Sequence, residues 1–429
     1  MRRISSKDLS WENFLRSLRE RGCSRDREVS LRVQEILESL RLGGKERLLS
    51  WARLLDGMPE QAESLEVQAE EWDKAQGLLP EEDRRALQIA AERIREFHLR
   101  CLLRSWLTVD SQGCLLGQLL QPLERVGIYV PGGKAQYPSS VLMTAIPARV
   151  AGVKEVIMCS PLAWSSPSPA VLAAAKIAGV DRVFRLGGPQ AVGAMAYGVG
   201  EIPRVDKIVG PGNAYVTEAK RMLFGEVDID MLAGPSEVLI LADGTVRAEL
   251  AAADMLSQAE HDESASALLV TPSGDYAEEV EASLEIQLAQ SPRESIARCS
   301  LENYGAILVC RDMEEAFAVA AEVAPEHLEL LVERPLDWLF MVKNAGAVFL
   351  GVGSPEAMGD YLAGPSHVLP TGGTARFSSP LGVEDFLKRT SIVGISQAGM
   401  NLLGPHALRM ARLEGLFAHA NSVDLRLAK

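Results

Sequence analysis

Long apolar runs are missing from this sequence of 429 residues. No run approaches the roughly 20 apolar residues that a helix needs to span a bilayer. The chain begins with the polar segment Met-Arg-Arg-Ile-Ser-Ser-Lys-Asp, which lacks the hydrophobic core of a secretory signal. We therefore expect a cytoplasmic protein with no membrane partner.

An excess of basic residues is also missing. Lys and Arg together number 44, against 58 Asp and Glu, which gives a net charge of −14. Because there is no basic tract, neither nucleic acid nor an anionic membrane surface is expected as a partner. The charge balance leaves open a small ligand or cofactor bound locally by backbone amides.

Cysteine is scarce and scattered. The six cysteines stand at positions 23, 101, 114, 159, 299 and 310, and none forms a Cys-x-x-Cys pair. In a chain this long, such spacing does not indicate a disulfide framework, and it fits a reducing cytoplasm.

What the sequence does contain is a change of pattern near residue 126. Residues 1 to about 120 have apolar residues at helical spacing, and from Val126 short β-rich runs alternate with Ala-rich helices. This alternation predicts parallel sheets covered by helices. Strands are expected at 126–130, 155–159, 182–186, 207–209, 238–242, 267–271, 305–310, 328–332 and 347–350. Helices are expected at 140–151, 169–178, 245–260, 313–323 and 405–413, and strand signals weaken after residue 378.

The first candidate site is at the end of the expected helix 245–260. Gln258 and His261 are three residues apart and share one helix face, so both can reach one metal ion. A polar helix end that faces solvent would have the same pattern.

A second candidate is the carboxylate–imidazole pair Glu326 and His327, which lies between an amphipathic helix and an apolar strand. Such a pair suits acid–base chemistry, and open α/β sheets bind ligands beyond the carboxyl ends of their strands. Other candidates lie in a Gly/Pro-rich stretch or in the C-terminal tail: Asp360, His367, Glu414 and His419. Each of these is also compatible with an ordinary exposed polar residue.

Three glycine-containing segments follow expected strands. They are residues 131–133, 187–193 and 210–213, and only the second approximates the Gly-x-Gly-x-x-Gly fingerprint of dinucleotide binding. Their backbone N–H groups can hold phosphate, but plain βα turns have the same composition. The pattern permits a nucleotide without demonstrating one.

Histidine is rare, and its distribution is informative. Of 6 histidines, those at 261, 327, 367 and 419 stand in polar or Gly/Pro-rich settings, whereas His98 is expected to be structural. Since neutral imidazole is a common metal ligand, two of them with a carboxylate and an amide oxygen would suit Zn²⁺.

Taken together, several segments resemble the histidinol dehydrogenase family. They are residues 127–133, 209–216, 233–237, 257–261, 324–329 and 364–373, and they occur in the family's order. The similarity runs from about residue 30 to the end of the chain. It is loose in the N-terminal third and weak over 392–410.

The resemblance implies a reaction and a set of roles. The family oxidises L-histidinol to L-histidine through L-histidinaldehyde, reduces two NAD⁺, and works as a homodimer whose C-terminal tail reaches the partner's site. The matching zinc ligands are Gln258, His261, Asp360 and His419, and the acid–base pair is Glu326 and His327. The matching substrate contacts are Ser236, Gln258, His261, His327, Asp360, His367, Glu414 and His419. The matching NAD contacts are Tyr129, Gln190 and Asn213.

We therefore predict an α/β fold with two incomplete Rossmann-like α/β/α domains and small, mainly helical segments at both ends. The expected domains are 23–125 with 236–378, then 126–235, with 1–22 and 379–429 as tail segments. A tail this small cannot bury its own apolar face, so we expect it to pack on another domain or subunit.

Three alternatives stay open. A zinc hydrolase could use the same ligands, with Glu326 activating water and no nucleotide. An aldehyde dehydrogenase could use Cys114 or Cys159 as nucleophile, although neither has an evident activating neighbour. A non-catalytic paralogue is disfavoured because each matching position carries a competent residue.

Overall fold

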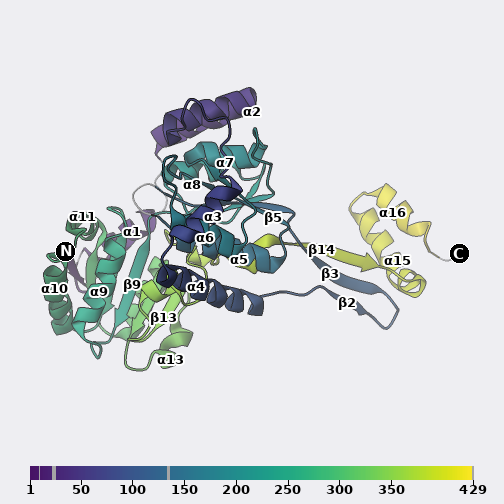
Figure 1. Cartoon of the computed structure of the whole chain (residues 1–429). Helices are drawn as coiled ribbons and strands as arrows, with labels where there is room; N and C mark the ends of the chain where they lie inside the picture. The colour runs from purple at the N-terminus through teal and green to yellow at the C-terminus, as the bar shows by residue number, and fades with distance from the viewer. Residues whose placement is uncertain (9, 22–25, 133–135, 428–429) are drawn as a thin grey trace.

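A computed structural model describes residues 1–8, 10–21, 26–132 and 136–427. Cys23 and Gly133, named above, lie outside the described residues. The described chain forms two lobes, each built on a parallel sheet, and an extended ribbon that carries the C-terminal helices away from them (Figure 1). The predicted α/β class with two Rossmann-like units is confirmed.

The first lobe is built on a six-stranded sheet with strands paired in parallel. In spatial order the strands are β1 (Arg2–Ser5), β11 (Ala306–Val309), β10 (Ser266–Thr271), β9 (Glu237–Ala242), β12 (His327–Leu331) and β13 (Ala347–Leu350). Helices α1 (Trp11–Arg21) and α12 (Met313–Val323) cover one face, and α9 (Ala248–Ala259), α10 (Gly274–Leu288) and α11 (Glu294–Tyr304) cover the other. The central strands are mostly apolar because both faces of the sheet are buried, and Glu329 in β12 is a fully buried exception.

The second lobe is built on a five-stranded parallel sheet. In spatial order its strands are β6 (Arg182–Arg185), β5 (Glu155–Ser160), β4 (Arg125–Tyr129), β7 (Lys207–Val209) and β8 (Asp228–Ile229). Helices α2 (Arg27–Asp56), α7 (Gly188–Tyr197) and α8 (Ala214–Leu223) cover one face. Helices α3 (Ala69–Leu78), α4 (Glu81–Arg100), α5 (Pro138–Ala151) and α6 (Pro169–Ala178) cover the other.

Local sequence explains the helix ends. In α6, for example, the Ser168 side chain accepts the backbone N–H of Val171, Pro169 occupies the first turn, and Gly179 closes the helix in the left-handed conformation. The short elements α13 (Pro335–Trp338) and α14 (Glu356–Tyr361) and three 3-10 helices (Leu339–Met341, Thr374–Arg376, Val383–Phe386) complete the connections.

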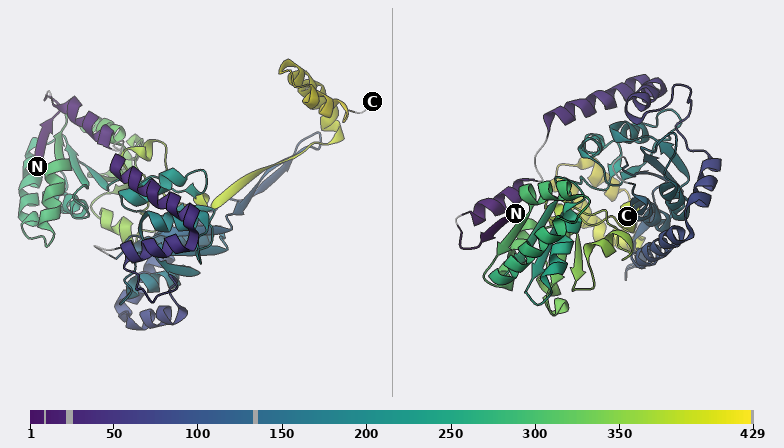
Figure 2. Two further views of the ribbon diagram at one scale, coloured as in Figure 1. Left: turned by 90° about the horizontal axis from the view of Figure 1, so that it is seen from above. Right: turned by 60° about the vertical axis from the view of Figure 1, so that its left-hand side comes forward.

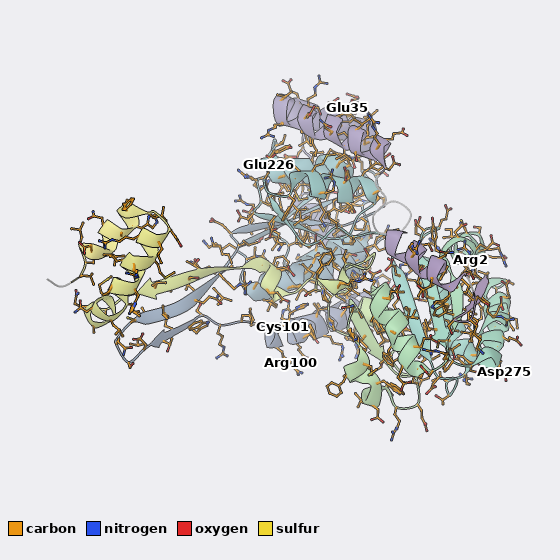
Figure 3. All side chains as sticks on the ribbon, turned by 180° about the vertical axis from the view of Figure 1, so that it is seen from behind. Arg2, Glu35, Arg100, Cys101, Glu226 and Asp275 are labelled. Atoms are coloured by element: carbon orange, nitrogen blue, oxygen red, sulfur yellow. The ribbon has the colours of Figure 1, made fainter. Side chains whose placement is uncertain are left out.

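The ribbon is a three-stranded antiparallel sheet that leaves the second lobe after α4, near the labelled residues Arg100 and Cys101 (Figure 3). Its strands are β2 (Trp106–Val109), β3 (Leu115–Pro122) and β14 (Leu387–Gly394). At its far end stand α15 (Gln397–Leu413) and α16 (Phe417–Asp424), well clear of both lobes in the left view of Figure 2.

The N-terminal segments pack differently from the expected domain grouping. Strand β1 pairs with β11 in the first lobe, so residues 1–22 do not group with the tail 379–429. Helices α2 to α4 pack mainly on the second lobe through residues such as Val33, Leu40 and Ile94, and α4 also contacts residues 236–378 at Leu362, whose backbone oxygen accepts from Arg93. Helical periodicity identifies the apolar face but not which sheet that face covers.

Three strands and one helix differ from the sequence expectation beyond residue 100. Strands β2 and β3 replace the end of the expected helical region, and β14 occupies a segment where no strand was expected. Helix α15 starts at Gln397, not at Pro405, which lies inside the helix. Among the described residues, no helix is both long and apolar enough to cross a membrane.

His98 lies in the last turn of α4 and is 1% exposed, and neither ring nitrogen has a hydrogen-bond partner among the described residues. Burial lowers its pKa to about 4. The unfolded chain, with an ordinary histidine pKa near 6.5, therefore binds the proton more tightly than the folded chain. Stability attributable to this residue is complete above that pH and is lost as the pH falls toward 4.

We predict that the free energy of unfolding falls by about 2 kcal/mol more in the wild type than in His98→Leu when the pH drops from 7 to 5. Urea unfolding at both pH values measures this difference. An equal loss in the two proteins would show that His98 does not take up the proton on unfolding.

Candidate active site

The predicted acid–base and metal residues meet at one edge of the first lobe. Glu237 begins β9, His327 begins the neighbouring β12, and Gln258 lies in the last turn of α9, which returns toward the start of the strands. This is the amino edge of the sheet, whereas we expected a site beyond the carboxyl ends. The expectation was wrong for this lobe because these residues precede their strands instead of following them.

Three side chains at this edge form a cluster suited to a metal ion. One ligand atom from each of His261, Glu356 and Asp360 lies within 4.8 Å of the others. An imidazole nitrogen and carboxylate oxygens are ligands that Zn²⁺ accepts, so the donor set fits the predicted zinc ion. The cluster also lies at the carbonyl end of α9, where the helix dipole favours positive charge.

Gln258 is fully buried beside this cluster. With its amide nitrogen turned toward Glu356, that nitrogen lies 3.0 and 3.2 Å from the two carboxylate oxygens. Glu356 was missed from the sequence, where it reads as an ordinary acid in the first turn of a helix after Pro355. The available signal was its spacing of four residues from Asp360, which puts both on one face of α14.

His327 is held in one orientation and one tautomer. Its Nδ1 lies 3.1 Å from the backbone carbonyl oxygen of Glu237, and since a carbonyl only accepts, Nδ1 carries the proton and donates it. The acceptor nitrogen is then Nε2. Burial lowers the pKa of His327 to about 4, even though the charge of Asp360 raises it, so the ring is neutral near pH 7. A neutral imidazole with an available Nε2 is a competent proton acceptor.

Glu326 lies next to this ring. Its Oε2 accepts the backbone N–H of Glu237 at 2.9 Å and lies 3.8 Å from Nδ1 of His327. Burial raises the pKa of Glu326 well above its usual value, the Glu237 N–H opposes the rise, and the charges of Glu237 and Asp360 add to it. A carboxyl group with a raised pKa is a stronger base once it ionises.

Two further acids lie behind Glu356. The backbone N–H of Glu356 donates to Oε1 of Glu329 at 2.7 Å, and Glu329 is fully buried. Burial, together with the charge of Asp254, raises the pKa of Glu329 to about 9, and burial raises that of Asp254 to about 6. Because Glu329 remains protonated near pH 7 while Asp254 is mostly ionised, this inner layer carries about one negative charge and not two.

The predicted substrate contacts are divided between this edge and the tail. Ser236 directly precedes β9, and His367 donates through Nδ1 to the backbone oxygen of Asp360 at 3.0 Å. The other ring nitrogen of His367 lies 3.2 Å from the Ser140 hydroxyl of the second lobe. Both nitrogens of His367 are thus engaged, and the residue joins the two lobes at the site.

Glu414 and His419 are not brought to this edge within one subunit. Both are exposed, at the end of α15 and in α16, and the tail stands apart from the lobes (Figure 1). Within one subunit, the site therefore lacks one predicted zinc ligand, His419, and one predicted substrate contact, Glu414.

The residues that match NAD contacts gather on the second lobe. Tyr129 ends β4, Asn213 caps α8 after β7, and Gln190 lies in the first turn of α7. Chain order runs outward from β4 through β5 and β6, then resumes at β7 on the other side of β4. The carboxyl edge at such a reversal is where open α/β sheets bind ligands. In this lobe the three residues lie at the carboxyl edge of the sheet, where the sequence led us to expect a ligand site.

The N-terminus of α7 is already satisfied by side chains. The N–H of Gly187 donates to Oδ1 of Asp56 at 2.7 Å, and that of Gly188 donates to the Tyr129 hydroxyl at 3.1 Å. The Asp56 carboxylate also accepts the Gln190 amide at 2.8 Å. Asp56, unnoticed in the sequence, thus occupies the place where a Gly-x-Gly-x-x-Gly turn would hold phosphate, which explains why that motif is imperfect here.

Gly210 lies against Tyr129 at the same edge. A Cβ atom at Gly210 would lie 2.1 Å from the backbone oxygen of Tyr129, and φ is +115°. Only glycine fits this close approach, so the sequence at 210–213 reflects the packing of two turns.

Comparison with known proteins agrees with this geometry. Residues 19–427 match the family model described as histidinol dehydrogenase. A histidinol dehydrogenase of Syntrophotalea carbinolica is 54% identical over 427 residues, covering 100% of this chain and 99% of that protein. That of Geobacter metallireducens is 51% identical over 428 residues, covering 100% and 98%. The crystal structure of histidinol dehydrogenase from Elizabethkingia anophelis superposes with a TM-score of 0.94 at 35% identity, covering 99% of this chain and 98% of that one. The chain belongs to the histidinol dehydrogenase family.

Proposed function

We propose that the protein oxidises L-histidinol to L-histidine through L-histidinaldehyde, with the reduction of two NAD⁺, in the cytoplasm. The observation that carries the proposal is the meeting of a neutral, oriented imidazole, His327, with the cluster of His261, Glu356 and Asp360 at the amino edge of one sheet. A reaction on a substrate with nitrogen ligands and a hydroxyl group needs both features together.

The cluster would hold zinc through Gln258, His261 and Asp360, with His419 as a fourth ligand. A bound zinc ion would anchor the imidazole and amine nitrogens of histidinol, which is the template role of a metal ion. The buried amide of Gln258 and the carbonyl end of α9 support a cation at this position.

His327 and Glu326 would move the protons. Nε2 of His327 takes the hydroxyl proton of histidinol as hydride leaves the carbon for NAD⁺, which yields the aldehyde. Glu326 then takes a proton from water as the water oxygen adds to the aldehyde carbon, and protonated His327 returns its proton to the carbonyl oxygen, which gives the hydrate. The hydrate loses the second hydride to a second NAD⁺ while neutral His327 takes the proton of its hydroxyl group. The carbonyl oxygen of Glu237, which accepts from Nδ1, stabilises the protonated ring during transfer.

Both NAD⁺ molecules would bind in turn at the carboxyl edge of the sheet in the second lobe. Tyr129, Gln190 and Asn213 are the proposed contacts. Burial raises the pKa of Tyr129 to about 12, so its hydroxyl stays protonated and keeps its hydrogen-bonding capacity.

The active site would be shared between two copies of the chain. Large apolar side chains of the tail are exposed in one subunit, among them Met410, Leu413 and Phe417 at 62%, 79% and 75% exposure. Exposed apolar area on this scale normally marks a contact surface. We propose a homodimer in which Glu414 and His419 of one subunit complete the partner's site.

The proposal is tested by incubating zinc-loaded protein with histidinol and NAD⁺ and following NADH absorbance. We expect histidinol-dependent NADH formation. No NADH from a fully zinc-loaded protein would contradict the proposal and favour the alternative of a zinc hydrolase with Glu326 as base.

A cysteine-dependent aldehyde dehydrogenase predicts a different result. Burial strongly raises the pKa of Cys159, a core residue of β5, and Cys114 is buried near Ser396 in the ribbon. Neither lies at the site formed by His327 and the cluster of His261, Glu356 and Asp360. We predict that replacing both with alanine leaves turnover within about twofold of the wild type, since the chemistry does not use a thiol. A loss above about a hundredfold with zinc still bound would instead support a cysteine nucleophile.

A further inference from the structure

Glu356 has no part in the proton transfers proposed above, yet it lies at the centre of the cluster. It is the first residue of α14 and is 1% exposed. Its backbone N–H, held 2.7 Å from Oε1 of Glu329, attaches the start of α14 to strand β12. The backbone of Glu356 is therefore held in place independently of the contacts that its side chain makes with the site.

The carboxylate of Glu356 contacts two residues with proposed roles. With the Gln258 amide turned so that its nitrogen faces Glu356, the two carboxylate oxygens lie 3.0 and 3.2 Å from that nitrogen, and Oε1 lies 3.6 Å from Nδ1 of His327. Both oxygens are thus within hydrogen-bond distance of one amide. Gln258 itself is fully buried, so no water competes for that amide nitrogen.

This contact decides which end of the amide faces the metal. A glutamine amide presents an oxygen acceptor on one side and an NH₂ donor on the other, in nearly the same shape. Only the oxygen can ligate a cation. Burial and the neighbouring acids raise the pKa of Glu356, whereas a zinc ion beside it would favour the ionised form. An ionised carboxylate accepts and does not donate, so Glu356 in that form stabilises the orientation with the nitrogen toward itself and the oxygen turned away.

We propose that Glu356 is a positioning residue that selects the orientation of the Gln258 amide in which Oε1 is available to zinc. The inference rests on the proposed function, because it takes Gln258 as a zinc ligand. Residues that orient ligands in this way typically change metal affinity by about 10- to 100-fold when replaced. Since Glu356 also lies within 4.8 Å of the ligand atoms of His261 and Asp360, the rival role is direct ligation.

A double-mutant cycle on zinc affinity separates the two roles. The dissociation constant for Zn²⁺ is measured on metal-free, full-length protein by competition with a chromophoric chelator, for wild type, Glu356→Gln, Gln258→Ala and the double variant. We expect Glu356→Gln to weaken zinc binding about 10- to 100-fold, because a glutamine at 356 can face Gln258 with either end. In the Gln258→Ala background the same substitution should change affinity by less than about twofold, since there is no amide left to orient.

Glu314→Gln is the matched control, an exposed carboxylate in the first turn of α12, and it should leave zinc affinity unchanged. Unchanged affinity in Glu356→Gln, or an equal loss in both backgrounds, would overturn the inference. If Glu356→Gln does not fold, the exchanged pair Gln258→Glu with Glu356→Gln keeps one carboxylate and one amide in contact. That variant should bind zinc within about tenfold of the wild type, and weaker binding would overturn the inference. A wild type that does not bind zinc would reject the zinc-dependent function itself.

Discussion

His327→Asn is expected to lower kcat for histidinol oxidation by about 10²- to 10⁴-fold, the range for loss of a positioned general base. The asparagine amide can still donate to the carbonyl oxygen of Glu237, as Nδ1 of His327 does at 3.1 Å. It has no basic nitrogen in place of Nε2. The variant therefore keeps the fold around β12 and loses the proton acceptor. Steady-state NADH formation under saturating substrates measures the effect.

The control for this substitution is His406→Asn, an exposed histidine in α15 with no proposed role, which should keep wild-type turnover. Zinc content should be equal in the wild type and both variants, because His327 is not a proposed ligand. A His327→Asn protein with full zinc and turnover within tenfold of the wild type would remove His327 from the chemistry.

The second large effect concerns the tail. His261→Ala and His419→Ala should each abolish activity, because each removes a proposed zinc ligand. If His419 acts on the partner subunit, mixing the two inactive proteins restores one intact site in every mixed dimer. Random exchange at equal concentrations makes half of the dimers mixed, so about a quarter of wild-type activity should return.

A matched pair makes this test specific. His261 and Asp360 belong to the same cluster, so mixing His261→Ala with Asp360→Ala leaves every site defective and should restore nothing. Subunit exchange is verified with two different affinity tags. Recovery in the control pair, or no recovery from His261→Ala with His419→Ala in verified mixed dimers, would contradict a shared site.

Regular elements of the two sheets were predictable because their patterns are local. Helix 169–178 and strands 207–209 and 347–350 were predicted with the observed bounds. Proline at a helix start, glycine at its end and apolar runs in buried strands each act over a few residues. The family resemblance added the relation between distant motifs, which spacing alone could not give.

The ribbon was not predictable in this way. Strand β14 has exposed side chains at most of its positions, so neither alternation nor an apolar run marks it. Gly399, Gly404 and Pro405 in α15 are usual signals of a helix break, and here they lie inside one helix. At Gly404, an added Cβ atom would lie 3.4 Å from Val423 of α16, so the close packing of the two helices favours glycine there.

Two site residues, Glu356 and Asp56, were not identified from the sequence for a different reason. Glu356 and Asp56 are single acids in helix-end positions where acids or polar residues are ordinary. Their importance comes from partners far away in sequence, Gln258 for the first and Gly187 with Gln190 for the second. The expectation of a site at the carboxyl edge was wrong because Glu326 and His327 stand at the start of strand β12 and therefore lie at its amino end.

The number of NADH molecules formed per histidinol consumed tests the central claim most directly. With zinc-loaded protein, limiting histidinol and excess NAD⁺, the proposed chemistry of Glu326 and His327 predicts two NADH per histidinol, with histidine as the product. One NADH per histidinol, with the aldehyde captured by a carbonyl reagent in solution, would contradict it.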